Sequence, residues 1–208
     1  MDFTALIDRT LPGPGSALDR ASRAVQAAVA KVTEAPAARP IVRVLHGNEV
    51  VGHPAHPAIV ALPIGAWSLT AWHDARGAVT GNTRHDQVAD AALRFGIAGA
   101  VVAVVTGLVQ YPDTRDAARR ETAVHSALNT IALGMYLTSA AMRSRGKRAP
   151  GRIIALGAMA LVGSSGVLGG DISYRHGVGV RPQVLRDPDL PASDTSAEPL
   201  ETSEARHS

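Results

Sequence analysis

The sequence predicts an all-α integral membrane protein: a four-helix bundle with an N-terminal amphipathic helical region and a disordered C-terminal tail. Three observations predict this fold class. Hydrophobic residues make up 46% of the 208 residues, whereas charged residues make up 19%. The charged residues collect in the tails and loops and leave long segments with almost none. Four of these segments are apolar over about the length of a bilayer-spanning helix. This segregation is typical of membrane proteins rather than of a soluble core.

Residues 1–46 are predicted to form the N-terminal helical region. The start, MDFTALIDRTLPG, is acidic and has no continuous apolar run, so we expect no cleavable signal peptide there. Ser16 and Asp19 form a capping-box pattern in SALDRASRAVQAAVAKV, which predicts that a helix starts there. We expect an interfacial helix lying on the membrane, and a solvated or partner-docking helix is the alternative. The apolar face of this helix consists of Leu18, Val25, Val29 and Val32.

Residues 47–180 are predicted to form the transmembrane domain. A spanning helix needs about 20 apolar residues, within a range of about 17 to 25. The first segment is short, and Pro63 and Gly65 weaken it. Trp67 and Trp72 support it, because they lie near its far end, where indoles favour the membrane interface. The four predicted spans are residues 57–72, 89–111, 123–142 and 153–172.

Small residues recur at a spacing of four in the second and fourth segments. Such rows let helix backbones approach closely in lipid, so they predict tight helix packing. Glycine and alanine are common in this chain, but two interleaved rows in one helix favour real interfaces. The rows are Ala92, Gly96 and Ala100; Gly99, Ala103 and Gly107; Ser165 and Gly169; and Gly166 and Gly170.

Residues 181–208 are predicted to form a disordered polar tail, because proline, serine and acidic residues dominate there. The net charge of +3 is small, and the basic residues lie mainly in loops between apolar segments, so we expect no nucleic-acid partner. The chain contains no cysteine, which excludes disulfides, a thiolate metal site and covalently attached haem.

Polar residues from distant parts of the sequence meet at one membrane face if the four segments cross the bilayer alternately. This face carries His53, His56, Asp113, His125, Asp171, Tyr174 and His176. The third segment also carries polar residues at offsets that place them in one helical stripe, which should face the bundle interior. The stripe consists of His125, Asn129, Tyr136, Ser139 and Arg143.

The histidines of this face define the candidate site. The prolines of GHPAHP favour a polyproline-like path of about three residues per turn, so His53 and His56 are expected to point the same way. Neutral imidazole is the commonest protein metal ligand and a usual ligand of haem iron. A purely structural polar network and a proton or solute path are the alternatives. The candidate cofactor-binding residues are His53, His56, His125, His176, Asn129 and Tyr136, and the candidate metal ligands are His53, His56, His125, Asp113 and Asp171.

The run GHPAHPAIVALPIGAW and several later motifs resemble the domain of unknown function 2231 family, bacterial membrane proteins of four predicted helices. LHGNEVVGHP and ALDRA also look like the upstream region of that family, so the resemblance covers nearly the whole chain except the tail. The matching motifs are Gly52–Pro57, Pro63–Trp67, Tyr111 with Asp113, His125 with Asn129, and Gly169–Val180.

Three positions depart from the family pattern. The family usually has tryptophan where Tyr111 stands, and it often has a polar residue where Ala61 stands. Its histidine after the double glycine is Asp171 here. If that histidine is an obligatory haem ligand, this chain lacks it, whereas an aspartate suits a hard metal ion or a proton path.

The resemblance leaves the activity open, since the family is defined without one. Some members are joined to or encoded beside Rieske or cytochrome domains, which implies a membrane redox module with such a partner. Haem b or a divalent metal ion is the candidate cofactor. A non-catalytic scaffold or subunit of a larger complex, and a small transporter or proton path, are the alternatives, and homo-oligomerisation is open.

No hydrolase triad, phosphate loop or zinc-protease motif occurs in the sequence, so whether the chain is an enzyme stays open. We expect a multi-pass protein of the inner (plasma) membrane with both termini on the same side of it.

Overall fold

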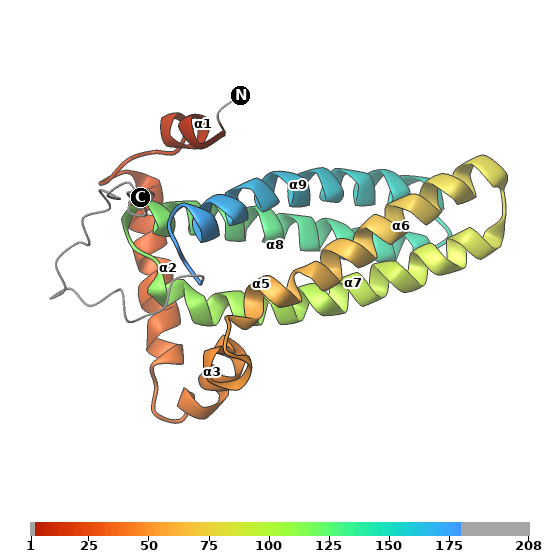
Figure 1. The fold of residues 1–208 in the computed structure, drawn as a ribbon. Helices are drawn as coiled ribbons and strands as arrows, with labels where there is room; N and C mark the ends of the chain where they lie inside the picture. Colours follow the sequence, from red (N-terminus) through yellow and green to blue (C-terminus); the bar gives the residue numbers. More distant parts are fainter. Residues whose placement is uncertain (1–2, 180–208) are drawn as a thin grey trace, which may run out of the picture.

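The computed structural model describes residues 3–179, in which every regular element is a helix. Most of these residues belong to four long helices. Figure 1 shows that they form two antiparallel hairpins, α6 with α7 and α8 with α9, which lie side by side. The predicted all-helical fold is confirmed, and the predicted disordered tail, residues 181–208, lies outside the described residues. The long helices are α6 (Ala61–Thr80), α7 (Thr83–Gln110), α8 (Asp116–Ser144) and α9 (Arg148–Tyr174).

The bundle has two ends, which differ in their connections. At the loop end, Gly81 and Gly146 adopt positive φ angles of 65° and 75°, which only glycine takes readily, and close the two hairpins. At the η1 end, the short 3-10 helix η1 (Tyr111–Asp113) joins α7 to α8. The helices that precede α6 also lie towards the η1 end, as Figure 1 shows for α1, α2, α3 and α5. They are α1 (Phe3–Thr10), α2 (Ala17–Thr33), α3 (Arg39–His46), α4 (Asn48–Val51) and α5 (Ala55–Ile59).

Among the described residues, two helices are long and apolar enough to cross a membrane, namely Thr83–Asp113 and Arg148–Tyr174. The second and fourth predicted segments are thus candidate membrane spans by length and composition. The segments in α6 and α8 do not reach the same hydropathy, because α8 carries the polar stripe and the helical part of α6 contains Pro63 and Asp74.

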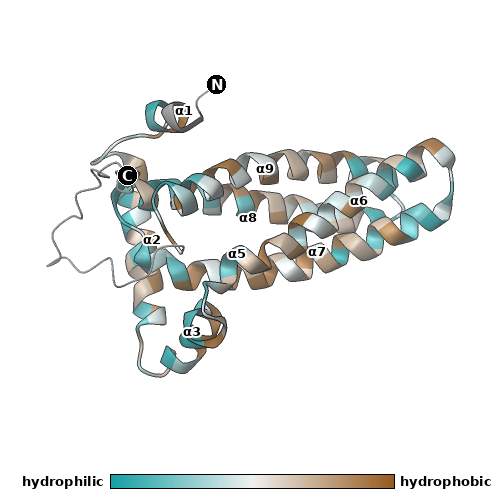
Figure 2. Cartoon of the chain, viewed as in Figure 1, coloured by the Kyte–Doolittle hydropathy of each residue, from teal (hydrophilic) through white to brown (hydrophobic). Residues whose placement is uncertain are grey.

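The helices extend well beyond the apolar segments from which they were predicted. The first segment was expected to end near Trp72, whereas α6 continues to Thr80. The helix is interrupted at Val60, because Pro63 has no N–H to bond the carbonyl of Ile59 four residues earlier. Hydropathy therefore locates the apolar zone of each helix and not its ends. Figure 2 shows hydrophobic residues along the middle of the long helices, whereas α2 and α3 carry both hydrophobic and hydrophilic residues.

Helix α2 lies across the η1 end and contacts η1 and the start of α8 (Figure 1). Ser16 caps it as predicted, since its Oγ accepts a hydrogen bond of 3.1 Å from the N–H of Asp19. The helix turns polar side chains towards the bundle: Ser22 is buried, and Gln26 Nε2 donates to the carbonyl of Thr114 at 2.7 Å. Val32 on the predicted apolar face is 68% exposed.

One aromatic contact joins all four long helices at the core of the bundle. Trp67 of α6 and Tyr136 of α8 stack with ring centroids 3.9 Å apart. The Tyr136 hydroxyl reaches Met159 Sδ of α9 at 3.6 Å. Trp67 also lies against Gly96 of α7, where a Cβ would be 2.5 Å from Cδ1 of the indole. Close packing in this layer therefore needs glycine at position 96.

The predicted rows of small residues have mixed outcomes. The rows through Ala92, Gly96 and Ala103 are confirmed, because these residues are buried against neighbouring helices. The row of Gly166 and Gly170 is wrong, since neither glycine has an atom of another part of the chain within 4 Å of its Cβ position.

Gly96→Ala is predicted to destabilise the bundle by about 1–3 kcal/mol, because the added methyl group must displace the Trp67 ring from its place against α7. Thermal unfolding of the detergent-purified protein, followed by circular dichroism, measures this loss. Gly163→Ala is the matched control, because a Cβ there meets nothing within 4 Å. Equal melting temperatures for the two variants would contradict this packing.

Candidate functional site

The polar residues predicted to share one membrane face lie at or near the η1 end of the bundle. They come from α5 and the residues just before it, η1, the first half of α8, and the end of α9 with the residues just after it, which Figure 1 places there. Among the described residues, only Asp171 and His176 of this set belong to a group of ligand atoms. His56 and His125 lie inside the bundle, and Asp113 lies against His46.

His56 is held between α5 and α7. Its Nδ1 lies 2.8 Å from the carbonyl oxygen of Ala103, and its ring covers Gly107, whose Cβ position is 3.0 Å from Cε1 of the imidazole. The predicted polyproline path is wrong here, because Ala55–Ile59 is helical and turns His56 into the bundle. His53 precedes this helix and is exposed.

His125 is held between α8 and α9 in the same way. Its Nδ1 lies 2.9 Å from the carbonyl oxygen of Ser165, and its ring covers Gly169, whose Cβ position is 3.0 Å from Cε1. Its Nε2 lies 3.0 Å from the amide nitrogen of Asn129. The stripe of α8 faces the bundle interior as predicted, since Tyr136 in its middle is 1% exposed.

Asp113 belongs to η1, where His46 of α3 lies against it. The distance from His46 Nε2 to Asp113 Oδ2 is 3.1 Å, so this contact fastens α3 to the link between α7 and α8. Tyr174, also predicted for this face, is 84% exposed at the end of α9. Asp113 belongs to no group of three or more His, Asp or Glu side chains that could hold a metal ion among the described residues.

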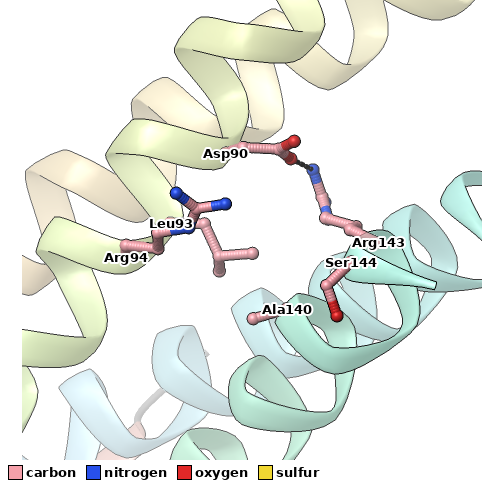
Figure 3. A pocket seen from close by; sticks show the side chains of 6 residues that line it. All are labelled: Asp90, Leu93, Arg94, Ala140, Arg143 and Ser144. Carbon is pink, nitrogen blue, oxygen red and sulfur yellow. Dashed lines mark hydrogen bonds and ion pairs between the residues drawn. The ribbon is translucent and has the colours of Figure 1, made fainter. Parts of the chain in front are cut away.

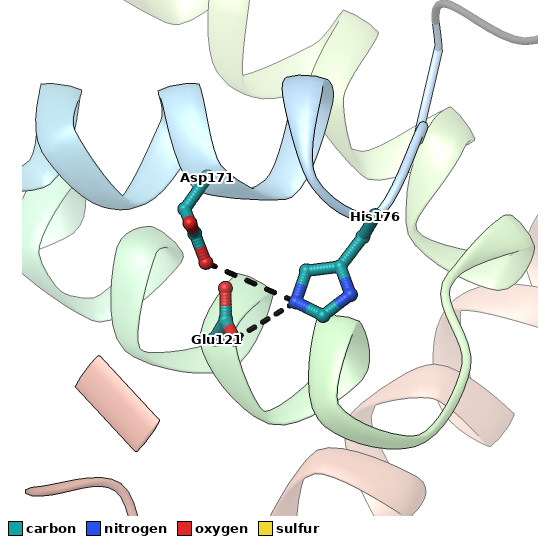
Figure 4. Close-up of side chains that lie close together, drawn as sticks. All are labelled: Glu121, Asp171 and His176. Carbon is teal, nitrogen blue, oxygen red and sulfur yellow. Dashed lines mark hydrogen bonds and ion pairs between the residues drawn. The ribbon is translucent and has the colours of Figure 1, made fainter. Parts of the chain in front are cut away.

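One group at the η1 end has the composition of a metal site. The side chains of Glu121, Asp171 and His176 each offer a ligand atom, and these atoms all lie within 4.8 Å of one another. His176 Nε2 lies 2.9 Å from Glu121 Oε1 and 3.9 Å from Asp171 Oδ2 (Figure 4). Of the residues that the structure describes, only these three form such a group. We call it the Glu121 group.

Glu121 is the least accessible member of the Glu121 group. It is 1% exposed, no N–H group of the described residues donates to its Oε2, and its carboxyl is within hydrogen-bond reach of the carboxyl of Asp171. Burial raises the pKa of Glu121 above its usual value, the carboxyl of Asp171 adds to the rise, and His176 opposes it. A buried carboxylate is costly unless a cation lies beside it.

Arg175 supplies positive charge to the Glu121 group in the structure. Its Nη2 lies 2.8 Å from Glu121 Oε1 and 2.7 Å from Asp171 Oδ2. Its Nη1 lies 2.9 Å from both carboxylate oxygens of Asp8 in α1. The guanidinium thus has an alternative partner outside the group, on a half-exposed residue.

Helix α2 fixes the start of α8, which carries Glu121. Arg119 Nη2 donates to Asp19 Oδ1 at 2.9 Å, and both side chains are buried. The pKa of Asp19 lies well below its usual value, because the N–H of Gly15 and the guanidinium of Arg119 donate to its carboxylate. This pair orients the first turns of α8.

The loop end carries a second charged cluster, in which three aspartates meet three arginines. Arg143 of α8 makes two parallel hydrogen bonds to Asp74 of α6, and its Nη1 lies 3.2 Å from Asp90 of α7. Its Nε donates to Ser139 Oγ at 3.0 Å. We call the six residues the loop-end charge layer. They are Asp74, Asp86, Asp90, Arg143, Arg148 and Arg152.

The remaining arginines of this layer come from α9. Arg148 Nη2 lies 2.6 Å from Asp90 Oδ2, and Arg152 Nη2 lies 2.6 Å from Asp86 Oδ1. All four long helices therefore contribute to one ion-pair network. Its charges cancel, which makes it a structural network rather than a binding site for an ion.

Sequence reasoning missed Glu121 and the loop-end charge layer. A signal for Glu121 was present, since it precedes His125 by four residues and so continues the polar stripe of α8. The pairing of Asp86 and Asp90 with arginines of α9 had no such signal, because it depends on how the two hairpins pack.

A sequence model of the family described as "Predicted membrane protein (DUF2231)" matches residues 52–182. This range covers more than half of the chain and includes the four long helices. No curated protein and no solved structure matches the chain.

Arg143→Met is predicted to destabilise the bundle by about 3–5 kcal/mol, because Asp74 then remains buried without its main partner. Urea or thermal unfolding in detergent measures the loss. Arg145→Met is the control, since Arg145 is exposed and bonds only the carbonyl of Ala141 in its own helix. If both variants unfold like the parent protein, Arg143 does not hold the hairpins together.

Proposed function

Because the chain belongs to the DUF2231 family of predicted membrane proteins, we propose that it is a membrane protein that binds one divalent metal ion at the Glu121 group. One observation carries this proposal: ligand atoms of Glu121, Asp171 and His176 all lie within 4.8 Å of one another, and Glu121 among them is buried. The function is that of a metal-binding membrane module, and it includes no catalytic step.

The chemistry of the Glu121 group suits a transition metal of borderline softness. One imidazole and two carboxylates are ligands that Zn²⁺, Mn²⁺ and Fe²⁺ accept. Ligand atoms of a tetrahedral zinc ion lie about 3.4 Å apart, given metal–ligand distances of about 2.1 Å. The separations of 2.9 and 3.9 Å between His176 and the two carboxylates bracket this value. Small side-chain movements therefore suffice to enclose an ion.

Arg175 competes with the ion in this proposal. Its guanidinium holds the position from which a cation neutralises Glu121 and Asp171, and it must retreat when a metal ion enters. Asp8 offers the place to which it retreats, because both carboxylate oxygens of Asp8 already bond Arg175. Removing Arg175 should accordingly favour the metal.

We further propose that all four long helices cross the bilayer. The colours of Figure 1 show that α7 and α9 run in the same direction. Helix α8 joins the end of α7 to the start of α9, so it must cross if both of them do. The stretches of these helices without Asp, Glu, Lys or Arg are about 27–32 Å long, close to the hydrocarbon thickness of about 30 Å. They are residues 95–112, 122–142 and 153–170.

This topology places the two ends of the described chain on one side of the membrane, which we propose is the plasma membrane. Asp8 of α1 and Arg175 after α9 form an ion pair at the η1 end, which supports the assignment. Helix α2 then lies at the membrane surface, where its exposed valines meet the lipid interface.

A second candidate function, histidine ligation of haem b in a redox module, is favoured by the geometry of His56. Ligating histidines usually donate one ring N–H to a carbonyl, as the 2.8 Å distance from Nδ1 to Ala103 allows. His125 suits this role less well, because Asn129 already lies at its Nε2. A Rieske or cytochrome partner belongs to this candidate.

Glu121→Gln is predicted to weaken binding of Zn²⁺ or Mn²⁺ by about tenfold or more, because it removes a charged ligand. Arg175→Gln is predicted to strengthen binding, since it removes the competing cation. Isothermal titration of the detergent-purified protein measures both affinities and the stoichiometry, which should be one ion per chain.

Asp113→Asn is the control for a carboxylate at the same end but outside the Glu121 group. It should leave the metal affinity unchanged. Loss of affinity in this variant equal to that in Glu121→Gln would reject the Glu121 group as the site. A Soret band that His56→Ala abolishes would instead favour the haem candidate.

A further inference from the structure

Arg94 of α7 is a cation without a counter-charge. Among the described residues it makes no hydrogen bond or ion pair through its side chain, and it is exposed. Its neighbours at the loop end differ, because the three carboxylates of the loop-end charge layer are each paired with Arg143, Arg148 or Arg152. The positive charge of Arg94 is therefore left over.

The position of Arg94 along α7 is that of a membrane border. It is the last charged residue before the charge-free stretch of residues 95–112. Arg143, which lines the same cavity, is likewise the first charged residue after the charge-free stretch of α8. A long basic side chain at this level reaches the phosphate region of the lipids.

A cavity opens beside Arg94 where the two hairpins meet. It has a volume of about 230 Å³ and lies between α7 and α8 (Figure 3). This is several times the volume of about 30 Å³ that one water molecule occupies in the liquid. Its lining residues are Asp90, Leu93, Arg94, Ala140, Arg143 and Ser144.

The lining of the cavity suits a molecule that has an anionic group joined to an apolar part. Asp90 is neutralised by Arg143 and Arg148, which lie 3.2 and 2.6 Å from its oxygens, so Arg94 determines the net positive charge of the lining. A guanidinium matches two oxygens of a phosphate with parallel N–H donors. Leu93 and Ala140 form the apolar part of the wall.

We propose that this cavity binds the phosphate of an anionic membrane phospholipid, with Arg94 as its principal ligand. A phosphodiester carries one negative charge, which balances the one positive charge left in the lining. The lipid tails then descend between the hairpins beside Phe95, which is 59% exposed on the next position of α7. Basic pockets between membrane helices bind anionic headgroups in this manner. The inference rests on the proposed crossing of α7 and α8 and is independent of the Glu121 group.

Native mass spectrometry of the delipidated full chain in detergent, titrated with dioleoylphosphatidylglycerol, tests the proposal. Arg94→Gln should weaken binding of the first lipid by about tenfold, because it removes a charge-assisted contact. Arg94→Lys should give a smaller loss, since it keeps the charge without the paired donors. Arg84→Gln, an exposed arginine on the first turn of the same helix, should bind as the parent does.

Two further arms identify the source of the phosphate. Dioleoylphosphatidylcholine should bind more weakly than phosphatidylglycerol, because its own cation balances its phosphate. If inorganic phosphate displaces the lipid from the parent chain but not from Arg94→Gln, the cavity is a phosphate site whose ligand is soluble, and the assignment to a lipid is overturned. Equal lipid affinity in Arg94→Gln and Arg84→Gln would overturn the proposal. If Arg94→Gln binds Zn²⁺ with the affinity of the parent chain, the change in lipid binding concerns this cavity and not the Glu121 group.

Discussion

A charged side chain cannot remain alone in hydrocarbon, and the arrangement of this bundle depends on how that constraint is met. The charges of the long helices collect at two levels, and the helix segments between these levels carry none. At the loop end the four long helices are joined by the pairing of three aspartates with three arginines. All three arginines belong to the α8–α9 hairpin and all three aspartates to the α6–α7 hairpin. The ion pairs therefore fix the position of one hairpin along the other.

The two ends of the bundle balance their buried charges differently. The loop-end charge layer is neutral, so it needs no additional ion. At the η1 end, the carboxylates of Asp8, Glu121 and Asp171 share one guanidinium, that of Arg175. These carboxylates are partly buried, and His176 Nε2 lies 2.9 Å from Glu121 Oε1. This grouping of ligand atoms is the reason for proposing a cation site at the η1 end and none at the loop end.

The sequence was sufficient to predict the helices, because charge segregation and small-residue rows are local properties. It also predicted the inward stripe of α8 and the cap of α2 by Ser16. It could not predict which large group fills the space over each glycine, such as the His56 ring over Gly107. It misjudged GHPAHP, because the prolines fit the first turn of a helix as well as an extended path. The partners of Glu121 could not be predicted, because they lie more than fifty residues away in the sequence.

The central claim is that the chain crosses the membrane four times through the charge-free zone between the two charged levels. It can be tested by determining from which side of the membrane a reagent reaches each connection between the long helices. The chain has no cysteine, so single cysteines can be introduced without background. Val79 and Lys147 are exposed near the loop end, and Arg115 is exposed just after η1. Labelling of Val79→Cys, Arg115→Cys and Lys147→Cys by an impermeant maleimide in oriented membrane vesicles is the measurement. The account predicts that Val79→Cys and Lys147→Cys react from one side and Arg115→Cys from the other. Reaction of Arg115→Cys and Lys147→Cys from the same side would contradict it.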